Sequence, residues 1–226
     1  MSIVNHEKRE VTFKIVYAGT PVSGKTTNLQ YIHSRIDAGQ RGDLVSLATT
    51  SDRTLFFDFM PVSSTPIAGY AAKFSLYTVP GQVHYNATRQ LVLRGADGLV
   101  FVADSAPERL EENLESARVL MRNLTDNGTP LDQLPLVLQY NKRDLPNAAP
   151  RAQLDYLLNR PTNPFPVFET VAARGVNVFA CLNAVSQMVL QRFHAAMNPA
   201  APAEPPRPQA PAIPPAPRQP APAITR

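Results

Sequence analysis

The sequence contains little cysteine and no apolar run long enough to span a membrane. Its one cysteine, Cys181, excludes an internal disulfide bond, which predicts a reducing compartment. The first residues carry no signal peptide, and Ser2 stands where N-myristoylation requires a glycine. We therefore expect a cytoplasmic protein that reaches any other location only through its partners.

Charge and metal ligands are also scarce. Charged residues make up 18% of the chain and hydrophobic residues 44%, proportions that are ordinary for a soluble globular protein. The net charge is +4, and half of it comes from three arginines and one glutamate in the last 28 residues. The rest of the chain is near neutral, so we expect no nucleic-acid partner. The histidine, cysteine and carboxylate side chains show no transition-metal ligand spacing.

The stretch from Pro199 to the C-terminus differs from everything before it. Eleven of its 28 residues are proline and alanine is the next commonest, so it cannot build a packed core. We expect one folded domain over residues 1–198 and a disordered tail over residues 199–226. Eight of its prolines recur at every third residue from Pro199, which is the period of a polyproline II helix. The tail is either a spacer or a strip that docks in an aromatic groove of a partner.

The most informative local pattern is Gly19–Thr26, which has the form G-x-x-x-x-G-K-S/T. Residues 11–18 before it alternate like a strand, and residues 27–32 after it have apolar side chains at helical spacing. Strand, glycine loop and helix together predict a phosphate-binding loop, because the two glycines let the backbone amides turn inward toward phosphate oxygens.

Two side chains of this loop have distinct expected roles. Lys25 places a positive charge near the β- and γ-phosphates of a nucleotide, and the Thr26 hydroxyl is placed to bind Mg²⁺. The expected nucleotide contacts from this segment are Gly19, Ser23, Gly24, Lys25, Thr26 and Thr27.

Predicted strands and helices alternate along the rest of the domain. The strands are expected at residues 11–18, 55–60, 73–79, 98–103, 136–140 and 167–171, and the helices at 25–38, 86–93, 105–124 and 178–193. Ser105 is expected to cap the third helix, with Glu108 completing a capping box. This alternation predicts an α/β fold of the P-loop NTPase type, with a six-stranded, mostly parallel sheet flanked by helices.

A second motif, N-K-R-D at residues 141–144, follows a predicted strand. In the pattern N-K-x-D, the Asp144 carboxylate accepts hydrogen bonds from the two N–H donors of the guanine edge. Adenine lacks that donor pair and would leave a buried charge poorly paired, which discriminates strongly against it. Lys142 is expected to lie along the base and Asn141 to join the neighbouring loops. The predicted ligand is therefore GTP or GDP with Mg²⁺.

With these motifs the chain resembles the Ras-superfamily small GTPases and, more narrowly, the bacterial gliding-polarity GTPases of the MglA family. The stretches that carry the resemblance are residues 24–32, 50–59, 76–82 and 139–147. The resemblance covers about residues 5–193 and leaves out the tail. It implies a small GTPase domain over residues 1–198 and slow hydrolysis of GTP to GDP and phosphate.

The same resemblance implies a biological role and partners. It suggests a switch for cell polarity and gliding motility, accelerated by a roadblock-type (MglB-like) activating protein. An exchange factor and polarity or motility effectors would be further partners, and one of them would recruit the protein to a cell pole.

The resemblance also assigns site residues outside the first two motifs. Gln82 is placed like the glutamine that orients the attacking water, and Gly81 can offer its backbone N–H to the γ-phosphate. Arg53 is placed to act as an arginine finger supplied by the chain itself, and Thr54 to bind Mg²⁺. Ala172 is expected to contact guanine O6 through its backbone N–H.

Two residues depart from the pattern of small GTPases. Thr78 stands where most of them have an aspartate that anchors Mg²⁺, a substitution shared with the MglA family. Asp58 is either its replacement or a solvent-facing strand residue. Pro21 stands where Ras-type proteins and MglA usually keep glycine, and a proline offers no N–H to a phosphate. We hypothesise slower basal hydrolysis, or a weaker response to an activator, than in the family.

Two other functions are alternatives to the switch. One is a nucleotide-bound scaffold with little hydrolysis, which recruits partners through the proline-rich tail. The other is an ATP-using kinase, which is disfavoured because the N-K-x-D motif would then have no purpose.

Overall fold

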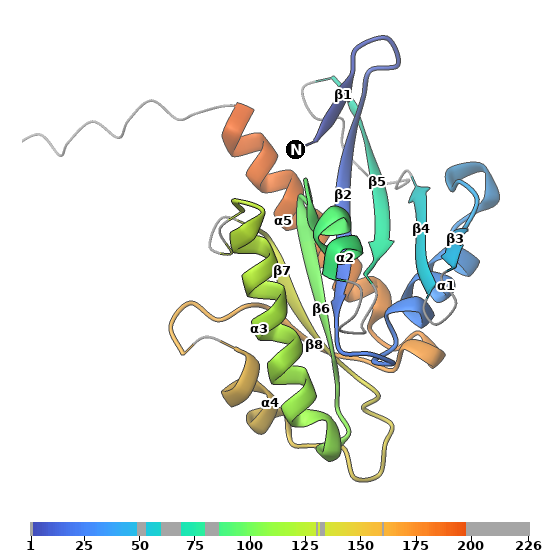
Figure 1. Ribbon diagram of the computed structural model, residues 1–226. Helices are drawn as coiled ribbons and strands as arrows, with labels where there is room; N and C mark the ends of the chain where they lie inside the picture. Colours follow the sequence, from blue (N-terminus) through green and yellow to red (C-terminus); the bar gives the residue numbers. More distant parts are fainter. Residues whose placement is uncertain are drawn as a thin grey trace, which may run out of the picture.

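The computed structural model describes residues 2–48, 53–59, 69–79, 86–129, 131, 134–159 and 161–197, and side chains for all of these except 47, 48, 53–59 and 86. Its strands form one sheet in the order β3-β4-β5-β2-β6-β7-β8, with β1 paired to β2 (Figure 1). The strands are β1 Ile3–Asn5, β2 Glu10–Gly19, β3 Val45–Ala48, β4 Arg53–Phe59, β5 Ala71–Thr78, β6 Gly98–Asp104, β7 Leu136–Asn141 and β8 Val167–Glu169.

The predicted α/β class with a mostly parallel sheet is confirmed. Strands β5, β2, β6, β7 and β8 run parallel, whereas β1, β3 and β4 pair antiparallel with their neighbours. The predicted number of six strands is wrong, because the described part of the sheet holds eight. The two additional strands are β1, whose three residues are all exposed, and the four-residue β3 at the sheet edge. Such short strands carry too little apolar alternation to be recognised in a sequence.

Five α-helices in the described part of the chain cover the two faces of the sheet. They are α1 Lys25–Arg35, α2 Asn86–Leu93, α3 Leu110–Asp126, α4 Arg151–Leu158 and α5 Val178–Met197, with short 3₁₀ turns at 38–40, 107–109 and 172–174. Figure 1 shows α2, α3 and α4 on the near face and α1 and α5 on the far face. Each face has its own buried apolar core.

The alternation of β2 explains how one strand serves both cores. Phe13, Ile15 and Tyr17 pack with α1 and α5, whereas Val16 and Ala18 pack with α2, α3 and α4. All seven residues of β6 are buried, as expected for a parallel strand covered on both faces. Burial of these apolar side chains is the main favourable term in folding.

The predicted cap of the third helix is wrong. Helix α3 begins at Leu110 after a 3₁₀ turn, and the Ser105 hydroxyl has no partner among the described residues. The Ala106 N–H donates instead to the Asp104 carboxylate at 3.0 Å, and Pro107 has no N–H to offer. The aspartate side chain therefore takes the amide that begins this turn.

The topology brings the sequence motifs to one edge of the sheet. Strands β2, β6 and β7 are parallel neighbours and end at Gly19, Asp104 and Asn141. The loops that follow these carboxyl ends lie side by side, at the place where ligands bind in open α/β sheets. None of the described helices is long and apolar enough to cross a membrane.

Candidate functional site

The loop after β2 is tightly curled. Gly19, Val22 and Gly24 all have left-handed backbone angles, with φ of 127°, 60° and 101°. The Ser23 N–H donates to the Thr20 carbonyl at 3.3 Å, which closes a turn across the residues between them. A valine at positive φ is strained, because its branched Cβ crowds the backbone there. No pattern in the sequence predicts this strain, which only the backbone angles reveal.

Helix α1 begins directly after this loop, and the positive end of its helix dipole is not balanced by a nearby side chain of the described residues. Among the described residues, no side chain caps the helix and no acidic residue lies in its first turn. Lys25, its first residue, is 7% exposed, and its ammonium group donates to the carbonyls of Gly19 at 3.1 Å and Thr20 at 2.6 Å. A helix N-terminus with a buried cation beside it is a fitting site for a phosphate anion.

Thr26 and Thr27 follow Lys25 at the helix start and are half-buried. The Thr26 hydroxyl is an oxygen ligand of the type that Mg²⁺ prefers, and a bound Mg²⁺ would neutralise phosphate charge. Thr78, at the end of β5, is 1% exposed. No group of three or more histidine, cysteine or acidic side chains that would hold a metal occurs in the described part of the chain.

Asn141 joins the phosphate loop to two other segments. Its Nδ2 donates to the Ser23 carbonyl at 2.7 Å, while its Oδ1 accepts from the Ala172 N–H at 2.9 Å and from the Thr170 hydroxyl at 3.0 Å. A Cβ on Gly24 would collide with the Asn141 amide nitrogen. Glycine at this position therefore permits the close approach of the two loops.

The residues expected to hold the base lie near Asn141 but differ in their contacts. Asp144 is exposed in the turn after β7, whereas Lys142 places its ammonium 2.5 Å from the Asp104 carboxylate. The Ala172 N–H, expected at guanine O6, is directed to Asn141 in this structure. A guanine oxygen would have to share that N–H.

A buried polar network that the sequence analysis missed supports these loops from below. Gln139 of β7 is fully buried and donates to Asn28 Oδ1 at 2.8 Å and to the Thr170 hydroxyl at 2.9 Å. Asn28 in turn donates to the Gly24 carbonyl at 2.9 Å. A glutamine inside the apolar strand Leu136–Asn141 was the available signal, because a buried polar side chain requires partners.

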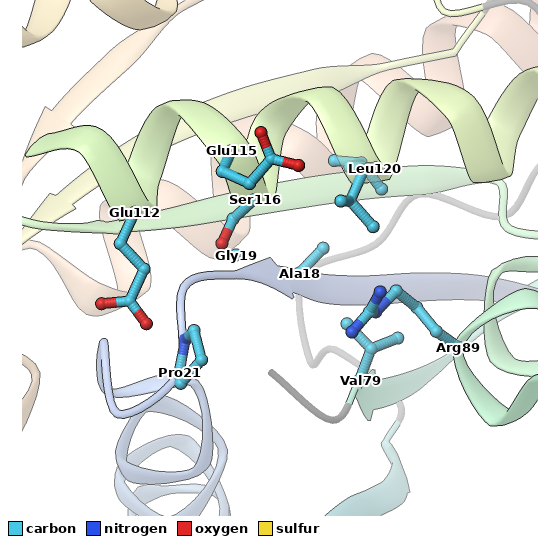
Figure 2. A pocket seen from close by; sticks show the side chains of 10 residues that line it. Ala18, Gly19, Pro21, Val79, Arg89, Glu112, Glu115, Ser116 and Leu120 are labelled. Carbon is cyan, nitrogen blue, oxygen red and sulfur yellow. The ribbon is translucent and has the colours of Figure 1, made fainter. Parts of the chain in front are cut away.

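A cavity of about 90 Å³ lies on the α3 side of the phosphate loop. Figure 2 shows Pro21 of the loop on one wall, and Glu112 and Glu115 of α3 on another. Arg89 of α2 also lines the cavity, and only 7% of this residue is exposed. Pro21 of the phosphate loop therefore faces α3 and these charged side chains.

Several predicted site residues lie outside the part of the chain that the structure describes, wholly or by their side chains. Arg53 and Thr54 lie in β4, opposite Ala48 and Leu47, but their side chains are outside the described set. The same holds for the side chain of Asp58, opposite Ser75. Residues 80–85, with Gly81 and Gln82, lie outside the described residues altogether, as does the tail.

Cys181 is fully buried in α5, and its thiol lies 3.8 Å from Gln139 Oε1. Burial raises the pKa of the Cys181 thiol, so the thiol stays protonated near neutral pH. Burial likewise raises the pKa of Tyr17, which packs in the same core. Cys181 is thus a structural side chain rather than a reactive one.

Comparison with known proteins agrees with this geometry. The model of the ADP-ribosylation factor family matches residues 1–197. The chain is also similar to "Mutual gliding-motility protein MglA" of Myxococcus xanthus (strain DK1622). The two are 51% identical over 190 residues, which cover 84% of this chain and 96% of that protein.

Proposed function

The chain belongs to the ADP-ribosylation factor family of small GTPases, and from its likeness to MglA we propose that it is a switch for cell polarity and gliding motility. It binds GTP and hydrolyses it. In the proposed cycle, the GTP form binds effectors, and hydrolysis returns the protein to a GDP form that releases them.

One observation carries the proposal above the others. The Asn141 amide bridges the Ser23 carbonyl of the phosphate loop and the Ala172 N–H of the loop after β8, so three separate segments meet at this residue. We infer that the phosphates lie on the loop over residues 19–26 and the base beside Asp144. The uncompensated N-terminus of α1 and the buried Lys25 would hold the phosphate charge.

We assign hydrolysis to Gln82 and Arg53, which lie outside the phosphate loop and the N-K-x-D motif. Gln82 would orient the attacking water, and Arg53 would place positive charge where negative charge develops. In comparable enzymes an arginine in this role accelerates hydrolysis by roughly 10³ to 10⁵. Thr26 and Thr54 would hold the Mg²⁺, and the Gly81 N–H would meet the γ-phosphate.

Multiple-turnover GTP hydrolysis with Gln82→Leu and Arg53→Ala tests these roles. Both variants should bind GDP like the wild type and lose turnover, since neither residue is needed to hold the nucleotide. Measurable wild-type hydrolysis that survives both substitutions would contradict the assignment. Guanine binding without turnover, with any activating protein, would instead indicate a scaffold.

The base assignment has a separate test in Asp144→Asn. The amide can donate to the 2-oxo group of xanthine, which the carboxylate cannot, so the variant should weaken GDP binding and strengthen xanthosine diphosphate binding. Unchanged GDP affinity would show that Asp144 does not contact the base.

The regulation that we propose involves a roadblock-type activating protein, an exchange factor and effectors at a cell pole. Pro21 would slow basal hydrolysis or blunt the activator, because it lacks an N–H for phosphate. Single-turnover rates of the wild type and Pro21→Gly, with and without the activator, test this, and identical rates would refute it.

The tail from residue 199 lies beyond the 1–197 span that the family model matches. We propose that it forms a separate region, with its three-residue proline period offered to an aromatic groove of a partner. Removing residues 199–226 should leave GDP affinity and turnover unchanged while it abolishes that recruitment. A change in either nucleotide property would tie the tail to the enzyme itself.

A further inference from the structure

Asp104, the last residue of β6, lies between the two nucleotide loops, and no motif accounts for it. Its side chain is 1% exposed. One carboxylate oxygen accepts from the Ala106 N–H at 3.0 Å, and the other lies 2.5 Å from the ammonium nitrogen of Lys142. The carboxylate is therefore fixed by its own turn and presents its second oxygen to the lysine of the N-K-x-D motif.

A second buried residue, Asn113 of α3, ties this aspartate to the phosphate loop. Asn113 is fully buried, its Oδ1 accepts from the Asp104 N–H at 2.9 Å, and its Nδ2 donates to the Asp104 carbonyl at 2.8 Å. The same Oδ1 accepts from the Thr20 hydroxyl at 2.5 Å. A continuous path of hydrogen bonds thus runs from the phosphate loop through Asn113 and Asp104 to Lys142.

We propose that Asp104 is a positioning residue of the guanine-nucleotide site, which holds Lys142 in place for the base and is itself anchored to the phosphate loop by Asn113. The inference rests on the proposed function, because it concerns the same site. Asp104 touches no part of the nucleotide in this scheme and acts only through Lys142.

The physical reason is the freedom of a lysine side chain. The Lys142 side chain is about one-third exposed, and Asp104 is the partner that its ammonium group has among the described residues. Ordering a free lysine side chain costs rotamer entropy, and a partner that orders it beforehand removes that cost from binding. A charge-assisted hydrogen bond to a buried carboxylate is a strong means of doing so.

The test is a double-mutant cycle on the dissociation rate of GDP that carries a fluorescent N-methylanthraniloyl group. Asp104→Asn keeps the oxygen that accepts from Ala106 N–H and turns an N–H₂ group toward Lys142. We expect dissociation to accelerate on the order of tenfold, from the entropy of the released lysine. Lys142→Ala should accelerate it at least as much, and the double variant no more than Lys142→Ala alone. A purely structural role of Asp104 would instead give effects that multiply.

A second Asp104 variant and a matched control complete the test. Asp104→Ser can still accept from Ala106 N–H but carries no charge for Lys142, so it should match Asp104→Asn and replaces it if that variant does not fold. Asp126→Asn, at the exposed far end of α3, makes the same chemical change away from the site and should leave the rate unchanged. Multiplying effects, or wild-type rates in both Asp104 variants, would overturn the inference while GDP binding by the wild type still supports the proposed function. Failure of the wild type to bind GDP would overturn both.

Discussion

Replacing the buried Gln139 by leucine should loosen the scaffold beneath both nucleotide loops. The change removes the donor to Asn28 Oδ1 at 2.8 Å and to the Thr170 hydroxyl oxygen at 2.9 Å, although that hydroxyl still donates to Asn141 at 3.0 Å. Asn28 Oδ1 is then a buried acceptor without its donor, which costs about 1–3 kcal/mol. At roughly 2–4 °C per kcal/mol for a domain of this size, a loss near 2 kcal/mol lowers the melting temperature by about 4–8 °C.

Thermal unfolding and urea titration of the nucleotide-free protein measure this loss, and the urea slope should stay constant while the midpoint falls. Gln153→Leu, at an exposed glutamine of α4, is the matched control and should change stability by less than about 0.5 kcal/mol. GDP should also dissociate faster from Gln139→Leu, because Asn28 holds the Gly24 carbonyl. If Gln139→Leu and the control have the same melting temperature, the polar network does not stabilise the fold and the reasoning fails.

Three further changes test other parts of the structure. Val22→Gly should stabilise the nucleotide-free protein by about 0.5–1 kcal/mol, because relief of the left-handed valine outweighs the added freedom of glycine, and a lower melting temperature would contradict the strain. Gly175→Ala should cost about 2–4 kcal/mol, because its Cβ would fall on the Tyr31 ring, and should cost clearly more than Gly128→Ala, which meets no atom within 4 Å. Folding raises the pKa of Cys181 above its usual 9.0, so the stability it confers is present below about pH 9 and is lost as pH rises further. Urea unfolding of Cys181→Ala should therefore show a shallower decline above pH 9, and parallel curves would refute the role of the thiol.

Much of the fold follows from local patterns in the sequence. The α2 helix over residues 86–93 and the apolar strand from Gly98 were predicted at nearly their observed bounds, because the helix has one buried side and the strand, buried on both faces, is a continuous apolar run. The exposed strand β1 and the start of α3 were not. The first has no buried face, and at the second a 3₁₀ turn over residues 107–109 precedes the helix, so the Ser105 hydroxyl makes no cap.

The residues of the candidate site likewise fall into those that the sequence predicts and those that it does not. Lys25 and Asn141 were found because the loops that carry them are contiguous motifs with a known chemistry. Gln139 and Asn113 were not, since each acts through partners distant in the sequence: Gln139 and Asn28 are 111 residues apart, and Asn113 and the Thr20 hydroxyl are 93. Only the folded chain brings such groups together. A single polar residue in an apolar segment indicates that it has a partner but does not identify that partner.

The central claim is that the loop over residues 19–26 holds the phosphates while Asp144 selects the base. Competition between GDP and ADP for the purified full-length protein in excess Mg²⁺ tests it most directly. We expect GDP to bind at least about 1,000-fold more tightly, because adenine would leave the carboxylate unpaired. Equal affinities, or a preference for ADP, would contradict the account.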